Sequence, residues 1–175
     1  MPDHPKAPAS VDPANGIGRG QPCRWGTEDF LSMGEEGLRS HLLDRALWAH
    51  GKYPDLDCAR IGEFLIDPGC LRYPARLVFD FGDMAPHQFV QPGPTPEDPA
   101  SGEMEIFVHP ALRLHEGFIP AAVAYAVPQI NYGDAATDEH CLLYGATLLG
   151  VTADEYYARL CTVADAVGAA ARYRT

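Results

Sequence analysis

The sequence predicts an α+β fold, with an N-terminal helix, a small and mostly antiparallel sheet, and a C-terminal layer of about three helices. Three observations predict it. Apolar residues recur every three or four positions between Glu35 and Gly51. Two runs in the middle of the chain alternate polar with apolar residues, and the last third holds long apolar segments of helical periodicity.

The size and composition of the chain fit one globular unit. Its 175 residues are 46% hydrophobic and 21% charged, which is enough apolar material for a core without metal or disulfide support. Residues 1–24 are rich in proline and glycine, so we expect a flexible tail there. We expect residues 25–175 to form a single α+β domain.

Helical periodicity begins the folded part. Leu38 and Leu42 belong to a repeat that predicts a helix from Glu35 to Gly51, where glycine is suited to follow the last turn. An earlier short helix is predicted from Thr27 to Met33. The segment Cys58–Asp67 predicts a turn of helix followed by a strand, which Pro68 and Gly69 end.

The alternating runs predict the strands of the sheet. Arg76–Phe81 and Met104–Pro110 each place apolar residues at every second position, as half-buried strands do. Phe89–Val90 predicts a third strand. The prolines that follow predict a loop over Gln91–Gly102, because proline cannot donate to a continuous ladder.

The last third predicts three helices. The first covers Phe118–Val127 and ends at a proline, and the second runs from a Thr137 cap to Leu149. Thr152 and Glu155 form a capping box for the third, which extends to about Ala171. The short link between the last two helices predicts an αα-hairpin.

The first two of these helices have almost no polar face. A helix that is apolar all round is buried by its own domain or by another subunit. We therefore predict a homo-oligomer or a stable protein partner, with residues 118–149 near the interface.

The charge of the chain excludes some partners. Lys and Arg number 13 against 24 Asp and Glu, for a net charge of −11. This field repels nucleic-acid phosphates and anionic membrane surfaces, so neither is an expected partner. The N-terminus does not resemble a signal peptide and no apolar run is long enough to span a bilayer, so we expect a cytoplasmic protein.

The five cysteines lack the spacing of a zinc ribbon or a secreted disulfide framework. Cys141 and Cys161 are equally far from the predicted hairpin link, so they could lie level across it. Two interpretations follow: a pair of small buried hydrophobic residues, or a redox-labile pair.

Ionisable residues gather around the predicted strand ends. His87, His109, His115 and Glu116 could hold a first-row transition metal if the loops bring them together, with Asp80 as a further ligand. The alternative is that these side chains are solvated or structural, because no known metal motif has this spacing.

A second polar cluster precedes the second C-terminal helix. His140 lies in its first turn, where the helix dipole keeps an imidazole neutral. A neutral imidazole suits metal ligation or general-base chemistry, and it equally suits a hydrogen bond at the helix start. Gln129, Asn131 and Asp134 would border any pocket formed there.

Two classes of function remain. The favoured one is an acidic cytoplasmic accessory or interaction protein without catalytic activity, oligomeric and acting by binding. The alternative is a small metalloprotein containing Zn, Fe or Mn, such as a hydrolase or a metal-handling protein, built on the His/Glu cluster. The sequence predicts no catalytic residue and no cofactor-binding motif.

Overall fold

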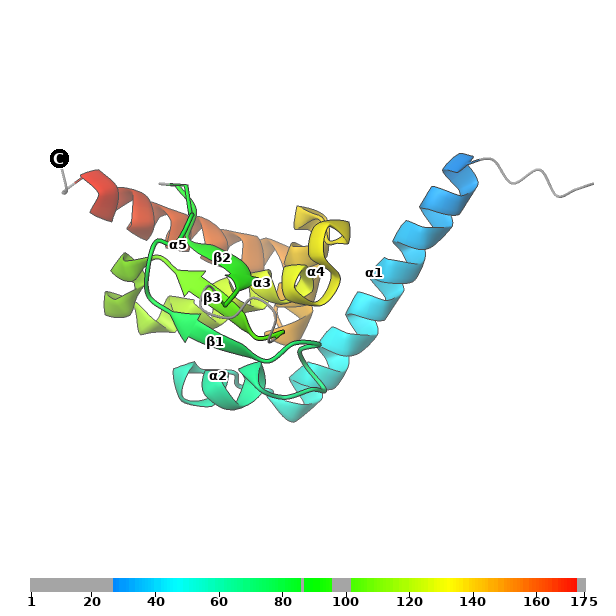
Figure 1. Cartoon of the computed structure of the whole chain (residues 1–175), viewed down its shortest axis with the longest axis horizontal. Coiled ribbons are helices and arrows are strands. Elements are labelled where there is room, and N and C mark those ends of the chain that lie inside the picture. The colour runs from blue at the N-terminus through cyan, green and yellow to red at the C-terminus, as the bar shows by residue number, and fades with distance from the viewer. Residues whose placement is uncertain (1–26, 86, 96–101, 173–175) are drawn as a thin grey trace, which may run out of the picture.

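The computed structural model describes residues 27–85, 87–95 and 102–172, and confirms the α+β class (Figure 1). The predicted tail, residues 1–24, lies outside these ranges. The elements in chain order are α1 (Thr27–Lys52), α2 (Cys58–Leu65), β1 (Ala75–Val78), β2 (Val90–Pro94), β3 (Met104–Val108), the 3-10 helices η1 (Pro110–Leu114) and η2 (Glu116–Phe118), α3 (Ile119–Tyr132), η3 (Gly133–Ala135), α4 (Asp138–Leu148) and α5 (Ala153–Arg172).

The three strands form a mixed sheet in the order β1-β3-β2. β3 is central and pairs antiparallel with β2, as expected of neighbours in the chain. It pairs parallel with β1, so the sheet is less antiparallel than the sequence predicts. In this register Arg76 lies opposite Glu105, and the two side chains form an ion pair across the strands.

β2 contains two prolines, Pro92 and Pro94, where the sequence predicts a loop. The prediction is wrong because β2 is an edge strand. The amide of Thr95 donates to the carbonyl of Glu103, and the carbonyl of Phe89 accepts from His109, so alternate residues of β2 face β3. The prolines fall between them, on the free edge, where no backbone donor is required.

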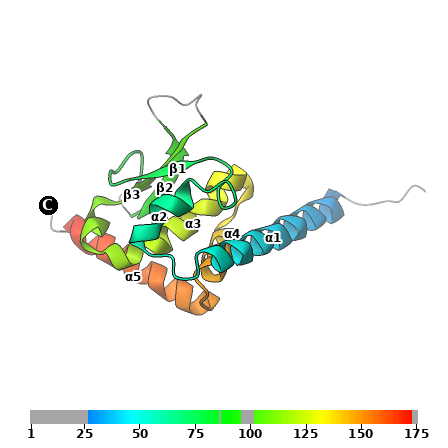
Figure 2. The ribbon, with the colours of Figure 1, turned by 90° about the horizontal axis from the view of Figure 1, so that it is seen from below.

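α3 is the central helix of the molecule. It lies against one face of the sheet, and α5 lies on its other side, with α4 beside it and α2 near β1 (Figures 1 and 2). Its buried residues point in every direction, which explains why this stretch has no polar face. The apolar character of residues 118–149 is therefore satisfied within the chain, without a second subunit.

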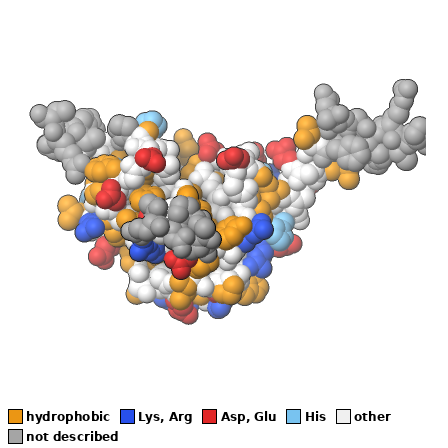
Figure 3. Space-filling view, viewed as in Figure 1, with side chains coloured by type: hydrophobic (Ala, Val, Ile, Leu, Met, Phe, Trp, Pro, Cys, Tyr) orange, Lys and Arg blue, Asp and Glu red, His pale blue; other side chains and the backbone are white. Residues whose placement is uncertain are grey.

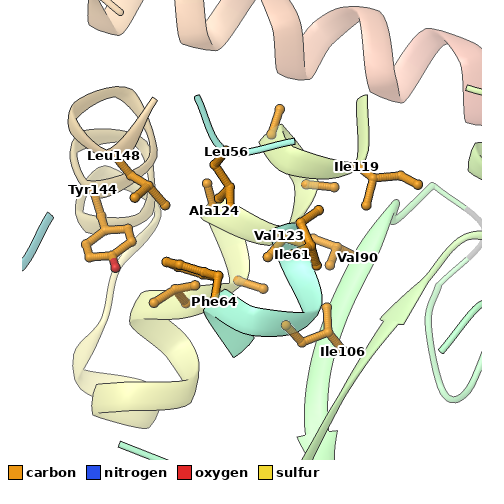
Figure 4. Close-up of a cluster of buried hydrophobic side chains, with 14 of the residues drawn as sticks. Leu56, Ile61, Phe64, Val90, Ile106, Ile119, Val123, Ala124, Tyr144 and Leu148 are labelled. Atoms are coloured by element: carbon orange, nitrogen blue, oxygen red, sulfur yellow. The ribbon is translucent and has the colours of Figure 1, made fainter. Parts of the chain in front are cut away.

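One continuous cluster of buried side chains joins these elements (Figure 4). Phe64 and Ile61 of α2 meet Val123 and Ala124 of α3 beneath the sheet. The strands contribute Ile106 and Val108, which are fully buried. None of the helices in the described ranges combines the length and apolarity needed to cross a bilayer.

α1 is a single helix of 26 residues, although the sequence predicts two helices separated near Gly34. Its C-terminal half packs on α4 through Leu42, Ala46 and Ala49, which are fully buried. The N-terminal half continues away from the body, as both ribbon views show (Figures 1 and 2). Glycine disfavours a helix interior but does not forbid it, so Gly34 did not end the helix.

Two further boundaries differ from the sequence prediction. Residues 58–67 contain helix α2 and no strand, because Ile61, Phe64 and Leu65 follow helical spacing and all three face the core. α3 continues through Pro128 to Tyr132. The turn after the proline buries Ile130 and Asn131, and this burial opposes the helix-breaking effect of proline, which is about 3 kcal/mol in an exposed helix.

The αα-hairpin of α4 and α5 forms as predicted. Gly150 ends α4 with φ of +64°, a conformation that favours glycine. The Thr152 amide donates to Glu155 and the Glu155 amide donates to the Thr152 hydroxyl, which confirms the capping box. Cys141 is buried and Cys161 exposed, and both are free thiols, so they do not form a pair.

Candidate functional site

His109 is a structural residue in this fold. It follows β3 and is buried, and its Nδ1 accepts a hydrogen bond from the Ala111 amide at 3.1 Å. This bond caps η1, while the Phe81 ring contacts the imidazole edge-on at 4.9 Å. The imidazole therefore serves the turn that leads from the sheet into the helices.

His115 and Glu116 lie next to each other at the junction of η1 and η2, and both are exposed. His115 contacts the ring of Phe118 at 5.8 Å between ring centroids. Glu116 borders a cleft, and its carbonyl accepts a hydrogen bond from the Cys58 thiol at 3.0 Å. Of the four predicted ligands, these two are neighbours.

The remaining predicted ligands lie elsewhere. His87 is exposed beside a groove of about 340 Å³ that Gln129 and Asp138 also line. Asp80 is exposed and accepts hydrogen bonds from the amides of Phe81 and Gly82 at 2.6 and 3.3 Å. Within residues 27–85, 87–95 and 102–172, no three His, Cys, Asp or Glu side chains are placed to share a metal ion.

A cleft of about 520 Å³ lies between α2, β1 and the η1–η2 junction. Ile61, Leu77 and Ile119 form its apolar lining. Arg113 places its guanidinium 5.0 Å from the ring centroid of Phe79, another lining residue. The cleft therefore combines an apolar floor with a charged rim, an arrangement typical of binding sites for small molecules or peptide side chains.

Cys58 is the nucleophilic side chain of this cleft, and the site keeps it protonated. Burial raises the pKa of the Cys58 thiol, and the nearby carboxylates of Glu116 and Asp57 raise it further. The thiolate is the reactive form of cysteine, so a raised pKa makes this side chain a poor nucleophile near neutral pH.

His140 caps α4. It is buried, its Nδ1 accepts from the Thr137 amide at 3.2 Å, and the Thr137 hydroxyl accepts from the His140 amide. Of the alternatives that the sequence leaves open, the structure shows the hydrogen bond at the helix start. Gln129 and Asn131 do border cavities, as predicted, but two different ones.

The outer surface of α1 carries exposed apolar side chains. Met33 and Leu47 are each 59% exposed, and Leu31, on the other face of the helix where it has left the body, is 69% exposed. Met33, Gly37, Ser40, Asp44 and Leu47 follow one another at spacings of four and three on the face opposite the core, and we call this set the outward stripe. Added side-chain atoms at Gly34 and Gly37 would meet nothing within 4 Å, so this face is open.

The sequence pattern did not indicate Cys58 and Arg113 as cleft residues, nor did it indicate the exposed stripe of α1. The cleft joins residues about 55 positions apart in the sequence, so no local pattern indicates it. The stripe did carry a signal, since Met33 and Leu47 are separated by two heptads, but it was hidden by the prediction that the helix breaks near Gly34.

Comparison of the chain with protein-family models, with curated proteins and with solved structures found no match.

Proposed function

We propose that this chain is an acidic cytoplasmic accessory or interaction protein that works by binding and not by catalysis, and that it self-associates through α1. The observation that carries the proposal is the outward stripe on a helix whose first half leaves the body of the fold. The stripe presents two exposed apolar side chains, Met33 and Leu47, on either side of the small residues Gly37 and Ser40, and we take this pattern as an interaction surface.

A second copy of the chain fits the pattern of this stripe. Met33 and Leu47 each lie seven residues from Ser40, so a two-fold axis at Ser40 places Met33 of one copy beside Leu47 of the other. The small residues Gly37 and Ser40 would allow two antiparallel helices to approach closely at the centre. A self-complementary surface of this kind is what a two-fold dimer requires.

The charges of α1 favour the antiparallel arrangement. Glu35 and Glu36 lie in its first half, whereas its second half contains basic residues, of which Lys52 is already paired with Asp67. An antiparallel pair of helices would therefore place the acidic half of one copy beside the basic half of the other. Asp44 disfavours this pairing, because it would lie near the acidic residues of the other copy, so the two-fold pairing requires an experimental test.

The test is the molar mass of the purified full chain, measured by size-exclusion chromatography with light scattering. We expect a dimer at micromolar concentration and a monomer for Leu47→Glu, because a charge replaces an apolar contact. Leu114→Glu is the matched control: Leu114 is 86% exposed on η1, away from α1, and the variant should remain dimeric. A monomeric wild-type protein contradicts self-association.

The orientation is tested by cross-linking in a background where Cys23 and Cys161 are replaced by serine. Ser40→Cys should form a covalent dimer under mild oxidation, because two such residues would meet at the two-fold axis. Ser32→Cys should not, since eight residues from the axis place its copies about 24 Å apart along the helices. Equal cross-linking of both variants would overturn the antiparallel pairing.

A further inference from the structure

A second cavity, of about 330 Å³, opens between α1, the segment after α2 and the end of α3. It is lined by His41, Arg45, Pro68, Cys70, Arg72, Asn131 and Tyr132. None of these lining residues is acidic, although the whole chain carries a net charge of −11. Figure 3 shows Lys and Arg side chains beside a histidine where α1 meets the body.

The two arginines have no carboxylate partner among the described residues. The guanidinium of Arg45 lies 5.4 Å from the Trp48 ring centroid, and that of Arg72 lies 5.3 Å from the Tyr73 ring centroid. By contrast, Arg39 and Arg76 each form an ion pair with a glutamate. Two unpaired guanidiniums on one cavity form a positive site in an acidic protein.

The backbone that carries Arg72 is fixed from within the fold. The Asn131 side chain, which is buried, accepts a hydrogen bond from the Arg72 amide at 2.7 Å and donates one to the Cys70 carbonyl at 3.0 Å. This clamp ties the segment to α3. The guanidinium of Arg72 therefore extends from a positioned backbone, as a preorganised binding site requires.

One buried hydroxyl in α4 has no partner among the described residues. Tyr144 is 1% exposed, and its hydroxyl has no hydrogen-bond partner in the described part of the chain. Burial raises the pKa of Tyr144, and the charged or ionisable groups that act on it are Cys70, Tyr132 and Arg45. All three line the cavity, although Tyr144 itself does not.

The carboxylate of Asp67, near the cavity, is already paired. Asp67 lies near Cys70, with 3.8 Å between its Oδ2 and the sulfur, but the same oxygen lies 2.6 Å from the ammonium of Lys52. It therefore does not neutralise the two arginines. An anionic ligand would meet guanidiniums that no carboxylate of the described residues occupies.

We propose that this cavity binds a small phosphate monoester, with Arg45 and Arg72 holding the phosphate and His41 and Tyr132 lining the space for its organic part. Guanidinium groups match phosphate oxygens in paired hydrogen bonds, and two of them suit a group that carries close to two negative charges. The volume suits a small ligand. This site is independent of the proposed self-association, since the outward stripe lies on another face of α1.

The test is a titration of the ¹⁵N-labelled full chain, followed by amide chemical shifts, with phenyl phosphate, inorganic phosphate and benzoate. We expect saturable shifts for Cys70, Arg72 and Tyr132 with phenyl phosphate. Arg45→Gln and Arg72→Gln should each weaken binding about tenfold or more, as loss of a charge-assisted contact predicts. Arg159→Gln, which changes an exposed arginine on α5, should bind as the wild type does.

The other outcomes contradict the proposal in distinct ways. If benzoate binds as tightly as phenyl phosphate, the site recognises carboxylates and the phosphate assignment is wrong. If neither arginine variant weakens binding, or if no amide around the cavity shows saturable shifts, the site itself is wrong. The spectra report whether each variant is folded, and Leu47→Glu separates this test from self-association because it should leave the titration unchanged.

Discussion

At the scale of single residues, Asp67 shows how one carboxylate joins separate elements. It accepts hydrogen bonds from Lys52 and Tyr53 at the end of α1, at 2.6 and 2.9 Å, and from the Gly69 amide at 2.8 Å. These donors favour the ionised form and lower the pKa of Asp67 to about 2. The end of α1 is thereby tied to the turn that follows α2.

Asp67→Asn should destabilise the protein by about 1–2 kcal/mol at pH 7, because donors to a charged acceptor lose their partner. The pKa of Asp67 is lower in the folded protein than in the unfolded chain. The ionised carboxylate therefore stabilises the folded state above about pH 4, and this stabilisation is lost as the pH falls toward 2. The free energies of unfolding of the wild type and of Asp67→Asn, measured with denaturant between pH 7 and pH 3, test this prediction. Asp55→Asn, at an exposed position, is the control, and an equal loss there contradicts the prediction.

Two buried tyrosines make a second prediction. The Tyr156 hydroxyl donates to the Ala121 carbonyl at 2.8 Å, whereas the Tyr144 hydroxyl has no partner within the described residues. Tyr156→Phe should cost about 1 kcal/mol, and Tyr144→Phe should be neutral or slightly stabilising, because it removes an unpaired polar group. Thermal unfolding of the two variants and the wild type measures these changes in stability. A larger loss of stability for Tyr144→Phe than for Tyr156→Phe would show that the Tyr144 hydroxyl has an unrecognised partner.

Residue roles were predictable where they depend on local spacing. The Thr137 cap and the Thr152–Glu155 box are short-range patterns, and both formed. The burial of His109 and the exposure of His115 depend on how the chain turns after β3, and no spacing encodes that turn. This is why a cluster that is close in sequence is spread out in the fold.

At the scale of elements, Gly145 sets how closely α4 and α5 approach. A Cβ atom at this position would overlap the ring of Tyr156. Gly145→Ala should destabilise by about 1–3 kcal/mol, because the fully buried ring cannot move without disturbing the core. Gly62→Ala is the matched control on α2, where a Cβ meets nothing within 4 Å.

The control should be stabilised by about 0.5–1 kcal/mol, since alanine is the better helix former. Chemical denaturation measures both variants. If Gly145→Ala were as stable as Gly62→Ala, the close approach of the two helices would not be required by the fold.

Elements were predicted well where periodicity dominates and poorly where packing overrides local preference. The helices of the last third were placed nearly to the residue, apart from the continuation past Pro128. β2 was underestimated because its prolines lie on a free edge, a fact that only the sheet order reveals. α1 was divided in two because Gly34 weakens a helix locally, whereas the exposed half needs no packing to remain helical in this structure.

At the scale of the whole molecule, the class of fold follows from composition and pattern, but the cavities do not. Arg45 and Arg72 are separated by 27 residues in the sequence, yet they line one cavity, and Asn131, still further along the chain, holds the backbone at Cys70 and Arg72. Apolar character alone suggested an interface at residues 118–149, whereas the chain covers α3 itself and leaves α1 open. The search for a partner therefore moves from the last third of the chain to its first helix.

During synthesis α1 is made before α4, the helix on which it packs. Arg39 pairs with Glu139 across 100 residues, so about 100 further residues must be added before α1 has its support. At a synthesis rate of about 5–20 residues per second, the apolar face of α1 remains uncovered for on the order of 5–20 s before α4 has been made. During that interval the nascent protein presents Leu42, Ala46 and Ala49 to chaperones and to other newly made copies, although the finished fold hides all three.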